Sequence, residues 1–300
     1  MDDIGYTSAK RYLKERYGGY VRRIPIDAGF TCPNRDGRCG VGGCIFCRGG
    51  GAGAGGVHGA VAEQLRKAKS GASMFMAYFQ SYTNTYAPVS ELSRIYEPAM
   101  RDPSVVCISI ATRPDCLDDD VVALLHDMNR TKDVFIELGL QTASDKTAAF
   151  INRGYGKDVF RAASKRLQDA GIERIVHMML GLPFEGRAEA DDTCDEVLLS
   201  GAKGIKIHSL YYEKGARILK MYEDYIASGG RDWHIMSLDE YAEAAARAVL
   251  RLGRGVVVHR LTGDADRSLL VYPKWAGNKI EVRNAIAAEL TRQGSRPVSR

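Results

Sequence analysis

The sequence predicts an α/β fold in which six consecutive βα units form an incomplete, TIM-like barrel of parallel strands. Short apolar, β-branched segments alternate with longer segments of helical periodicity. Successive apolar segments begin roughly 30 to 50 residues apart, which leaves room for a helix in each crossover between parallel strands. The six predicted strands cover residues 21–28, 74–80, 104–111, 133–140, 173–180 and 204–210.

The segment 158–171 shows how the crossovers are expected to form helices. Asp158 is a candidate N-cap, because its carboxylate can accept a hydrogen bond from a free backbone N–H of the first turn. Gly171 is expected to end the helix, because glycine adopts the left-handed conformation that follows many helices. The predicted apolar face of this helix comprises Val159, Ala163, Leu167 and Ala170.

The pattern changes after the sixth strand. Two helices, a short strand and a further helix are expected there, and we interpret them as an α/β segment that covers the barrel. The chain is thus divided into a barrel, residues 1–215, and a C-terminal extension, residues 216–300. The glycine-rich stretch 49–59 is expected to be a mobile loop. The four predicted elements of the extension are 217–228, 238–252, 255–261 and 280–293.

The overall composition is that of a globular protein. Of the 300 residues, 45% are hydrophobic and 26% are charged, which excludes a disordered chain, a coiled coil and a collagen-like fibre. The net charge of +5 permits contact with nucleic acid without requiring it. No run approaches the 18 apolar residues of a membrane span, and the N-terminus lacks a secretory pattern. A cytoplasmic protein without membrane contact is therefore expected.

Cysteines are crowded into one part of the chain. Four of the seven, Cys32, Cys39, Cys44 and Cys47, directly follow the first predicted strand, at the barrel end where active sites of such folds lie. In a reducing compartment this crowding indicates a metal site more often than disulfides. One interpretation is a closed structural zinc site with four thiolate ligands. The other is an iron–sulfur cluster with three cysteine ligands and one open iron.

Several short motifs lie at predicted strand ends, in a fixed order. In these motifs the chain resembles the radical S-adenosylmethionine (SAM) superfamily, and within it the YhcC/YtqA-like group, which is related to the Elongator catalytic subunit. The resemblance covers nearly the whole chain. It is carried by residues 29–37 (GFTCPNRDG), the C-x11-C-x2-C spacing of Cys32, Cys44 and Cys47, and residues 78–85, 112–115, 137–142, 152–154, 181–183 and 205–208.

The resemblance implies a 4Fe–4S cluster on Cys32, Cys44 and Cys47 whose open iron binds SAM. It also implies reductive cleavage of SAM to a 5′-deoxyadenosyl radical, with an electron donor such as flavodoxin or ferredoxin. Cys39 departs from the family pattern. We expect it to be either a spectator thiol or a ligand that replaces SAM when SAM is absent.

The resemblance also implies which residues contact SAM. The segment with Gln80 and Thr83 is expected to bind the amino group, and Arg153 the carboxylate. Glu137 is expected to bind the ribose or a nearby cation, with Gln141 beside it, and the alternative is a structural pair with a barrel lysine or arginine. His177 and the turn at Gly181 are expected near the adenine, although a lone strand histidine is more often a core residue. Arg113, with Asp115, is expected to face the barrel mouth.

Three residues are candidates for substrate contact or catalysis. Lys206 and His208 alternate on the sixth predicted strand, so both point to the same side of the sheet. If that side is the barrel interior, these polar groups need a bound partner. The extension adds His259, followed by Arg260 and Asp264, at the end of its own strand.

By the same resemblance, the leading substrate is tRNA, in modification of the wobble-uridine side chain. A basic, tyrosine-rich stretch near the N-terminus is a candidate RNA contact, and the alternative is an ordinary solvated helix. A radical SAM enzyme acting on a small metabolite and a non-catalytic metal-binding protein remain as alternatives. The basic residues of this stretch are Lys10, Arg11, Lys14, Arg16, Arg22 and Arg23, and its tyrosines are Tyr6, Tyr12, Tyr17 and Tyr20.

Overall fold

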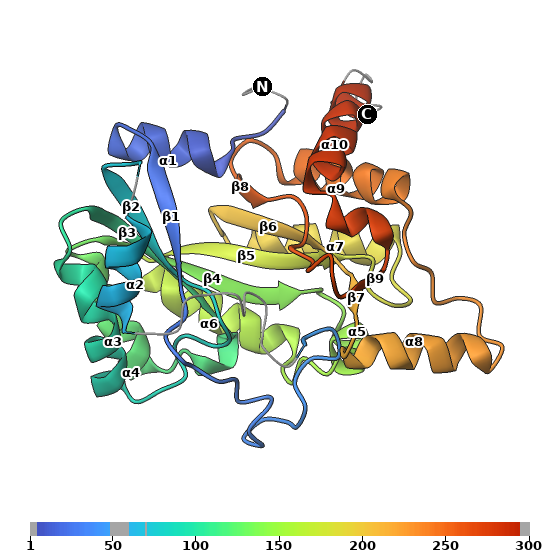
Figure 1. The fold of residues 1–300 in the computed structure, drawn as a ribbon, viewed down its shortest axis with the longest axis horizontal. Coiled ribbons are helices and arrows are strands. Elements are labelled where there is room, and N and C mark those ends of the chain that lie inside the picture. The colour runs from blue at the N-terminus through green and yellow to red at the C-terminus, as the bar shows by residue number, and fades with distance from the viewer. Residues whose placement is uncertain (1–4, 49–59, 70, 295–300) are drawn as a thin grey trace.

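A seven-stranded parallel sheet curls into an incomplete barrel, with helices on its outer face (Figure 1). The computed structural model describes residues 5–48, 60–69 and 71–294, so the glycine-rich stretch 49–59 lies outside the described residues. Neighbouring strands follow one another along the chain, which confirms the predicted βα units. In sheet order the strands are β1 (Val21–Ile26), β2 (Met74–Phe79), β3 (Val105–Thr112), β4 (Asp133–Gln141), β5 (Glu173–Leu180), β6 (Gly204–Ser209) and β8 (Val257–Arg260).

The strand predicted at 255–261 belongs to the barrel sheet. It forms β8, which pairs in parallel with β6 as a seventh strand, so its assignment to a covering segment is wrong. The pairing has a physical cause, since β6 would otherwise expose a row of unpaired backbone groups at the sheet edge. A two-stranded antiparallel sheet, β7 (Tyr212–Glu213) with β9 (Leu270–Tyr272), is separate from the barrel.

Helices cover the outer face of the sheet, and a large apolar core lies between them and the strands (Figure 1). Ile108, Ile136 and Ile205 point outward into this core and are fully buried. Within the described residues, no helix combines the length and apolar character needed to cross a membrane. The helices are α1 (Ala9–Tyr17), α2 (Val61–Ala68), α3 (Val89–Arg101), α4 (Asp119–Asn129), α5 (Asp145–Phe150), α6 (Lys157–Asp169), α7 (Arg187–Leu199), α8 (Arg217–Ala227), α9 (Leu238–Leu252) and α10 (Lys279–Gly294), with short 3-10 turns at Pro114–Cys116 and Lys274–Gly277.

The inward-pointing side chains change character along the barrel axis. Near the amino ends of the strands they are apolar, as for Met76, Cys107, Phe135 and Ile175, which pack together. Toward the carboxyl ends the same faces carry polar groups, because side chains two residues apart share one face of a strand. The polar set comprises Tyr78, Ser109, Glu137, His177, Lys206 and His208.

The helix predicted at 158–171 forms, but its first turn differs from the expectation. It is α6, and its N-cap is Gly156, so the prediction that Asp158 caps it is wrong. The Lys157 N–H instead donates to the Asp145 carboxylate of α5, at 2.7 Å. On the apolar face, Val159 is exposed and Phe160 is buried in its place.

Gly171 ends α6 as predicted, with a left-handed φ of +68°. No atom lies within 4 Å of the position that an added Cβ would take, so Gly171→Ala tests backbone strain alone. We expect this variant to lower the free energy of unfolding by about 1 kcal/mol. Gly255→Ala is the matched control, because its Cβ also meets nothing within 4 Å and its φ lies outside the left-handed range. Equal shifts of the urea midpoint in both variants would contradict the strain argument.

Candidate active site at the carboxyl end of the barrel

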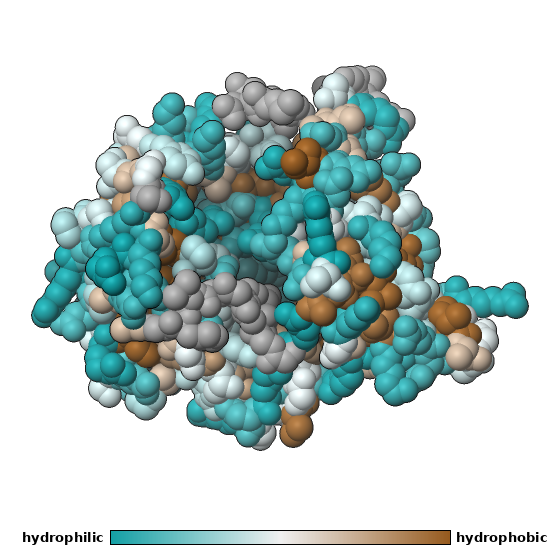
Figure 2. Space-filling model, viewed as in Figure 1, coloured by the Kyte–Doolittle hydropathy of each residue, from teal (hydrophilic) through white to brown (hydrophobic). Residues whose placement is uncertain are grey.

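A cavity of about 270 Å³ opens at the carboxyl ends of the strands. Figure 2 shows a hollow near the centre of the face turned to the viewer, surrounded mostly by hydrophilic residues. Its wall is built by the loop after β1 and by residues in or just after six strands, β2 to β6 and β8. The predicted site residues that line it are Cys32, Cys44, Cys47, Gln80, Thr83, Arg113, Glu137, Gln141, His177 and His208.

The cysteine loop is held against the barrel by two asparagines. Asn34 is fully buried, and its side-chain amide donates to the carbonyl of Asn152 and approaches the Cys44 sulfur at 3.8 Å. Asn152 returns a hydrogen bond to the Gly43 carbonyl at 2.8 Å and has a positive φ of 54°. These contacts fix the loop to the turn between α5 and α6.

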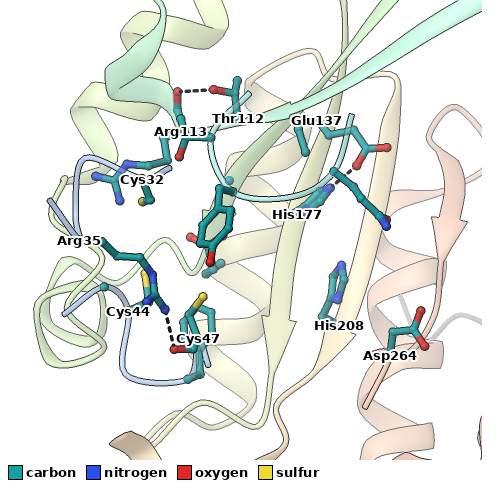
Figure 3. A pocket seen from close by; sticks show the side chains of 18 of the residues that line it. Cys32, Arg35, Cys44, Cys47, Thr112, Arg113, Glu137, His177, His208 and Asp264 are labelled. Carbon is teal, nitrogen blue, oxygen red and sulfur yellow. Dashed lines mark hydrogen bonds and ion pairs between the residues drawn. The ribbon is translucent and has the colours of Figure 1, made fainter. Parts of the chain in front are cut away.

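Three free thiols share the cavity wall. Cys32, Cys44 and Cys47 all line the cavity, whereas Cys39 is exposed and does not (Figure 3). Burial, together with repulsion from the neighbouring Cys47 and Cys32 thiolates, raises the pKa of Cys44 to about 12. A bound cation is the group that would offset this repulsion, because metals bind thiolates and release their protons.

This donor set fits a 4Fe–4S cluster. Among the described residues, no three His, Cys, Asp or Glu side chains lie close enough together to hold one metal ion. In a cluster each cysteine binds a different iron, so the thiols need to surround a volume and not a point. A closed zinc site would need Cys39 as its fourth ligand, and that side chain is exposed and does not line the cavity.

Two arginines lie beside the cysteines. Arg35 donates to the carbonyls of Cys47 and Arg48 at 3.0 and 2.9 Å, and its guanidinium lies 5.8 Å from the ring centre of Tyr82. Since carbonyl groups leave its charge uncompensated, Arg35 can attract an anionic group of a bound cofactor.

Arg113 is held differently from Arg35. It forms a bidentate pair with Asp115, at 2.9 and 2.6 Å, and donates to the Arg153 carbonyl at 2.9 Å. Its guanidinium also lies 4.8 Å from the ring centre of Tyr155. Arg113 lines the cavity, as predicted, but much of its hydrogen-bonding capacity is used within the protein.

Glu137 is the centre of a buried polar cluster on the cavity floor. It forms an ion pair with Lys206, accepts a hydrogen bond from Ser109 at 2.8 Å, and lies 2.9 Å from His177 Nε2. The Lys206 ammonium also donates to the Tyr78 hydroxyl at 2.9 Å. Glu137 therefore has the structural barrel partner that was the alternative to a SAM ribose contact.

The protonation of this cluster follows from burial and charge. Burial alone would raise the pKa of Glu137, but Lys206 and His177 hold it well below its usual range. Burial lowers the pKa of His177, and burial together with the Arg260 charge lowers the pKa of His208 well below its usual range. Neutral imidazoles therefore face the cavity at pH 7, and their rings lie 5.3 Å apart.

Four predicted site residues do not line the cavity. Arg153 is 1% exposed and donates to the carbonyls of Leu140, Thr142 and Tyr155, so the structure places it behind the cavity wall, and its role as the SAM carboxylate ligand stays a prediction. Lys206 is fully buried behind Glu137 and is not positioned for direct substrate contact.

Gly181 and His259 are the other two predicted site residues that do not line the cavity. Gly181 lies in a separate group of crevices next to Met236 and does not line this cavity, so the expected approach to adenine stays a prediction. His259 lies inside the barrel against Gly204, on the same strand face as Val257, because β8 pairs with the start of β6. Burial lowers the pKa of His259 to about 3, and His259 does not line the cavity, so its role toward the substrate stays a prediction.

Comparison with known proteins decides the family. The model of the radical SAM superfamily matches residues 36–197, and the model of a radical SAM C-terminal domain matches residues 202–292. The chain belongs to the radical SAM superfamily. It is accordingly a SAM-dependent enzyme, and its cofactors are a 4Fe–4S cluster and SAM.

Two curated proteins align with most of this chain. The uncharacterized protein YtqA of Bacillus subtilis (strain 168) is 38% identical, over 97% of this chain and 91% of its own length. The protein YhcC of Escherichia coli (strain K12) is 36% identical, over 89% of this chain and 86% of its own length. These relatives confirm the predicted YhcC/YtqA-like group.

Among solved structures, the archaeal Elp3 of Methanocaldococcus infernus has a similar fold. The TM-score is 0.64 at 15% identity, and the match covers 78% of this chain and 57% of the Elp3 chain. At this identity the likeness concerns the fold alone. It agrees with the incomplete barrel described above.

Several cavity residues were not predicted from the sequence. Tyr78 could have been found, since it lies two residues before Gln80 on the inward face of β2. Arg35, Tyr82, Tyr155 and Tyr211 come from loops, where no periodic pattern reports the direction of a side chain.

Proposed function

We propose that this radical SAM enzyme cleaves SAM reductively and removes a hydrogen atom from a side chain of the tRNA wobble uridine. The observation that carries the first part is the placement of Cys32, Cys44 and Cys47 on one wall of the cavity, with polar side chains on the opposite wall. When bound, the cluster and SAM supply a 5′-deoxyadenosyl radical, which abstracts hydrogen from an unactivated C–H bond.

The residues of the chain then have three tasks. Cys32, Cys44 and Cys47 would hold the cluster, and Arg35 would orient the carboxylate of SAM beside it. Gln80, Thr83 and Gln141 would supply further polar contacts, and Gln141 is turned inward by a bulge at the end of β4, with a φ of +57°. The enclosing wall excludes water from a reactive radical.

A cationic rim supports the choice of tRNA as substrate. Arg38, Lys214 and Arg217 are exposed near the cysteine loop, and within the described residues none of them forms an ion pair. Arg38 lies 5.5 Å from the ring centre of Tyr86, an arrangement that can bind phosphate and stack a base. The family resemblance of the sequence points to the same substrate.

The basic stretch near the N-terminus does not support tRNA as the substrate. Helix α1 lies at the amino ends of β4 and β5, away from the cavity (Figure 1). Arg16 is paired there with Asp133 and Glu173, which also accept hydrogen bonds from Tyr17 and Tyr12. Two of the four tyrosines and one arginine are thereby used to hold the helix to the barrel.

The reaction needs one electron from a donor of low potential, and flavodoxin or ferredoxin is the class proposed. A small metabolite is the second candidate substrate. The observation that favours it is the contribution of the C-terminal part to the cavity wall, through Tyr211, Arg260 and Asp264, which narrows the site opposite the cysteines.

The test is to compare nucleosides of total tRNA from cells with and without this gene by mass spectrometry. The expected result is a wobble-uridine nucleoside that is lost on deletion and restored by the wild-type gene but not by Cys44→Ala. The isolated undermodified tRNA should then be modified by the reconstituted protein with SAM and dithionite. Unchanged tRNA nucleosides, together with 5′-deoxyadenosine formation in vitro, would reject tRNA and favour a small substrate.

A further inference from the structure

The half of the cavity opposite the cysteines has a composition of its own. His177 and His208 from β5 and β6, Tyr211 from the loop after β6, and Arg260 and Asp264 from the C-terminal part line it. Figure 3 shows His208 and Asp264 on the far side of the cavity from Cys32, Cys44 and Cys47. A substrate held there would face the cofactor across the open space.

The carboxylates at this end are already neutralised. Asp264 forms an ion pair with Lys279 of α10, and Glu137 forms one with Lys206. Arg260 lines the cavity, and among residues 5–48, 60–69 and 71–294 it has neither a counter-ion nor a hydrogen-bond acceptor. Its guanidinium is therefore available to an acceptor that a ligand supplies.

The surroundings of Arg260 add to this positive charge. Arg23 lies inside the barrel over the Tyr78 ring, at 5.2 Å, and its Nε is buried without an acceptor. The cations Arg23, Lys206 and Arg260 thus outnumber the single buried carboxylate between them, Glu137. The protein does not itself balance this charge at the cavity floor.

A second polar atom at this end also lacks a partner. The Nε2 atom of His208 is buried and makes no hydrogen bond within the described part of the chain. Arg260 pairs in register with Lys206, two residues before His208 on the same face of β6, and both Arg260 and His208 line the cavity. A neutral imidazole can donate one N–H to an acceptor. One oxyanion could accept hydrogen bonds from both the Arg260 guanidinium and the His208 imidazole.

We propose that Arg260, with His208 beside it, binds an anionic group of the substrate, either a carboxylate or a phosphate. The inference rests on the proposed function, since it assigns the substrate end of the same cavity. A guanidinium binds both oxyanions in a bidentate manner, and such charged hydrogen bonds are about twice as strong as neutral ones. The substrate is therefore oriented by its charge, with its reacting carbon toward the cofactor half.

The test measures anion binding by the reconstituted holoenzyme in saturating SAM, so that the cofactor half of the cavity is filled. Inorganic phosphate and acetate are titrated separately, and the thermal midpoint is followed for wild type, Arg260→Gln and Arg254→Gln. Arg254 is the matched control, because it is an exposed arginine in the turn before β8, at the opposite end of that strand.

Wild type and Arg254→Gln are expected to bind one of the two anions with equal affinity, and Arg260→Gln to bind it at least about tenfold more weakly. Arg260→Lys keeps the positive charge, and we expect it to bind the anion with intermediate affinity. This variant replaces Arg260→Gln in the test if the glutamine variant does not fold. Preference for phosphate indicates a nucleotide or nucleic-acid phosphate, and preference for acetate indicates a carboxylate. Equal response of Arg260→Gln and Arg254→Gln to both anions would overturn the proposal.

This experiment separates the two hypotheses. Formation of 5′-deoxyadenosine by wild type, measured in parallel, tests the proposed function without reference to Arg260. If wild type forms it and Arg260→Gln binds anions normally, only the anion site is rejected. If wild type forms none and Arg260→Gln still loses anion binding, the site stands and the radical chemistry is rejected.

Discussion

Alanine at Cys32, Cys44 or Cys47 is expected to lower 5′-deoxyadenosine formation from SAM at least about 100-fold, because removal of even an outer-shell group of a metal site costs 10–100-fold. The three thiols line one cavity and are free of disulfides, so each is available to a different iron. The measurement is iron and acid-labile sulfide content after anaerobic reconstitution, followed by mass spectrometry of the nucleoside product. We expect both the cluster content and the product to be lost in all three variants.

Cys39→Ala is the matched control for this series. Cys39 belongs to the same loop but is exposed and lies outside the cavity wall. We expect this variant to keep wild-type iron content and wild-type product formation. Loss of metal in all four variants, with zinc in the wild-type protein, would contradict the three-ligand site and support a structural zinc site.

Lys206→Met is expected to lower the free energy of unfolding by about 3–5 kcal/mol, which is the usual cost of removing one partner of a buried ion pair. Both side chains of the Lys206–Glu137 pair are 0% exposed, so the remaining carboxylate would lose its counter-ion in a dry interior and keep the hydrogen bonds to His177 and Ser109. The measurement is urea unfolding of the wild type and the variant, followed by circular dichroism.

A second substitution distinguishes charge from packing. In Glu137→Gln/Lys206→Met the uncompensated carboxylate is gone, and we expect a substantial part of the lost stability to return. If the double variant is as unstable as the sum of the single variants, the ion pair contributes through packing, and the electrostatic argument is wrong.

Much of the fold could be predicted because its signals are local. Each of the six predicted barrel strands is present. They could be predicted because apolar, β-branched segments between helical segments indicate buried parallel strands. The cysteine loop could also be placed, because it directly follows β1 and therefore lies at the carboxyl edge of the sheet. The inward direction of Glu137 and His177 follows from the alternation along their strands.

The differences from these expectations come from contacts between distant segments. Arg153 was expected to bind SAM, but the carbonyls of Leu140 and Thr142 surround it once β4 and the turn after α5 come together. The cap of α6 is supplied by Asp145 of another helix, which no local pattern reports. His259 lies deep in the barrel because β8 pairs with Gly204–Lys206 at the start of β6, a long-range pairing that no local pattern reveals.

The most direct test of the account is the reaction of the wild-type protein with SAM. The protein is reconstituted anaerobically with iron and sulfide, reduced with dithionite, and mixed with SAM, and both the electron paramagnetic resonance signal and 5′-deoxyadenosine are measured. We expect a 4Fe–4S signal that changes when SAM is added, and we expect 5′-deoxyadenosine to form. A fully loaded cluster that yields no 5′-deoxyadenosine, or a colourless protein that holds zinc through four cysteines, would contradict it.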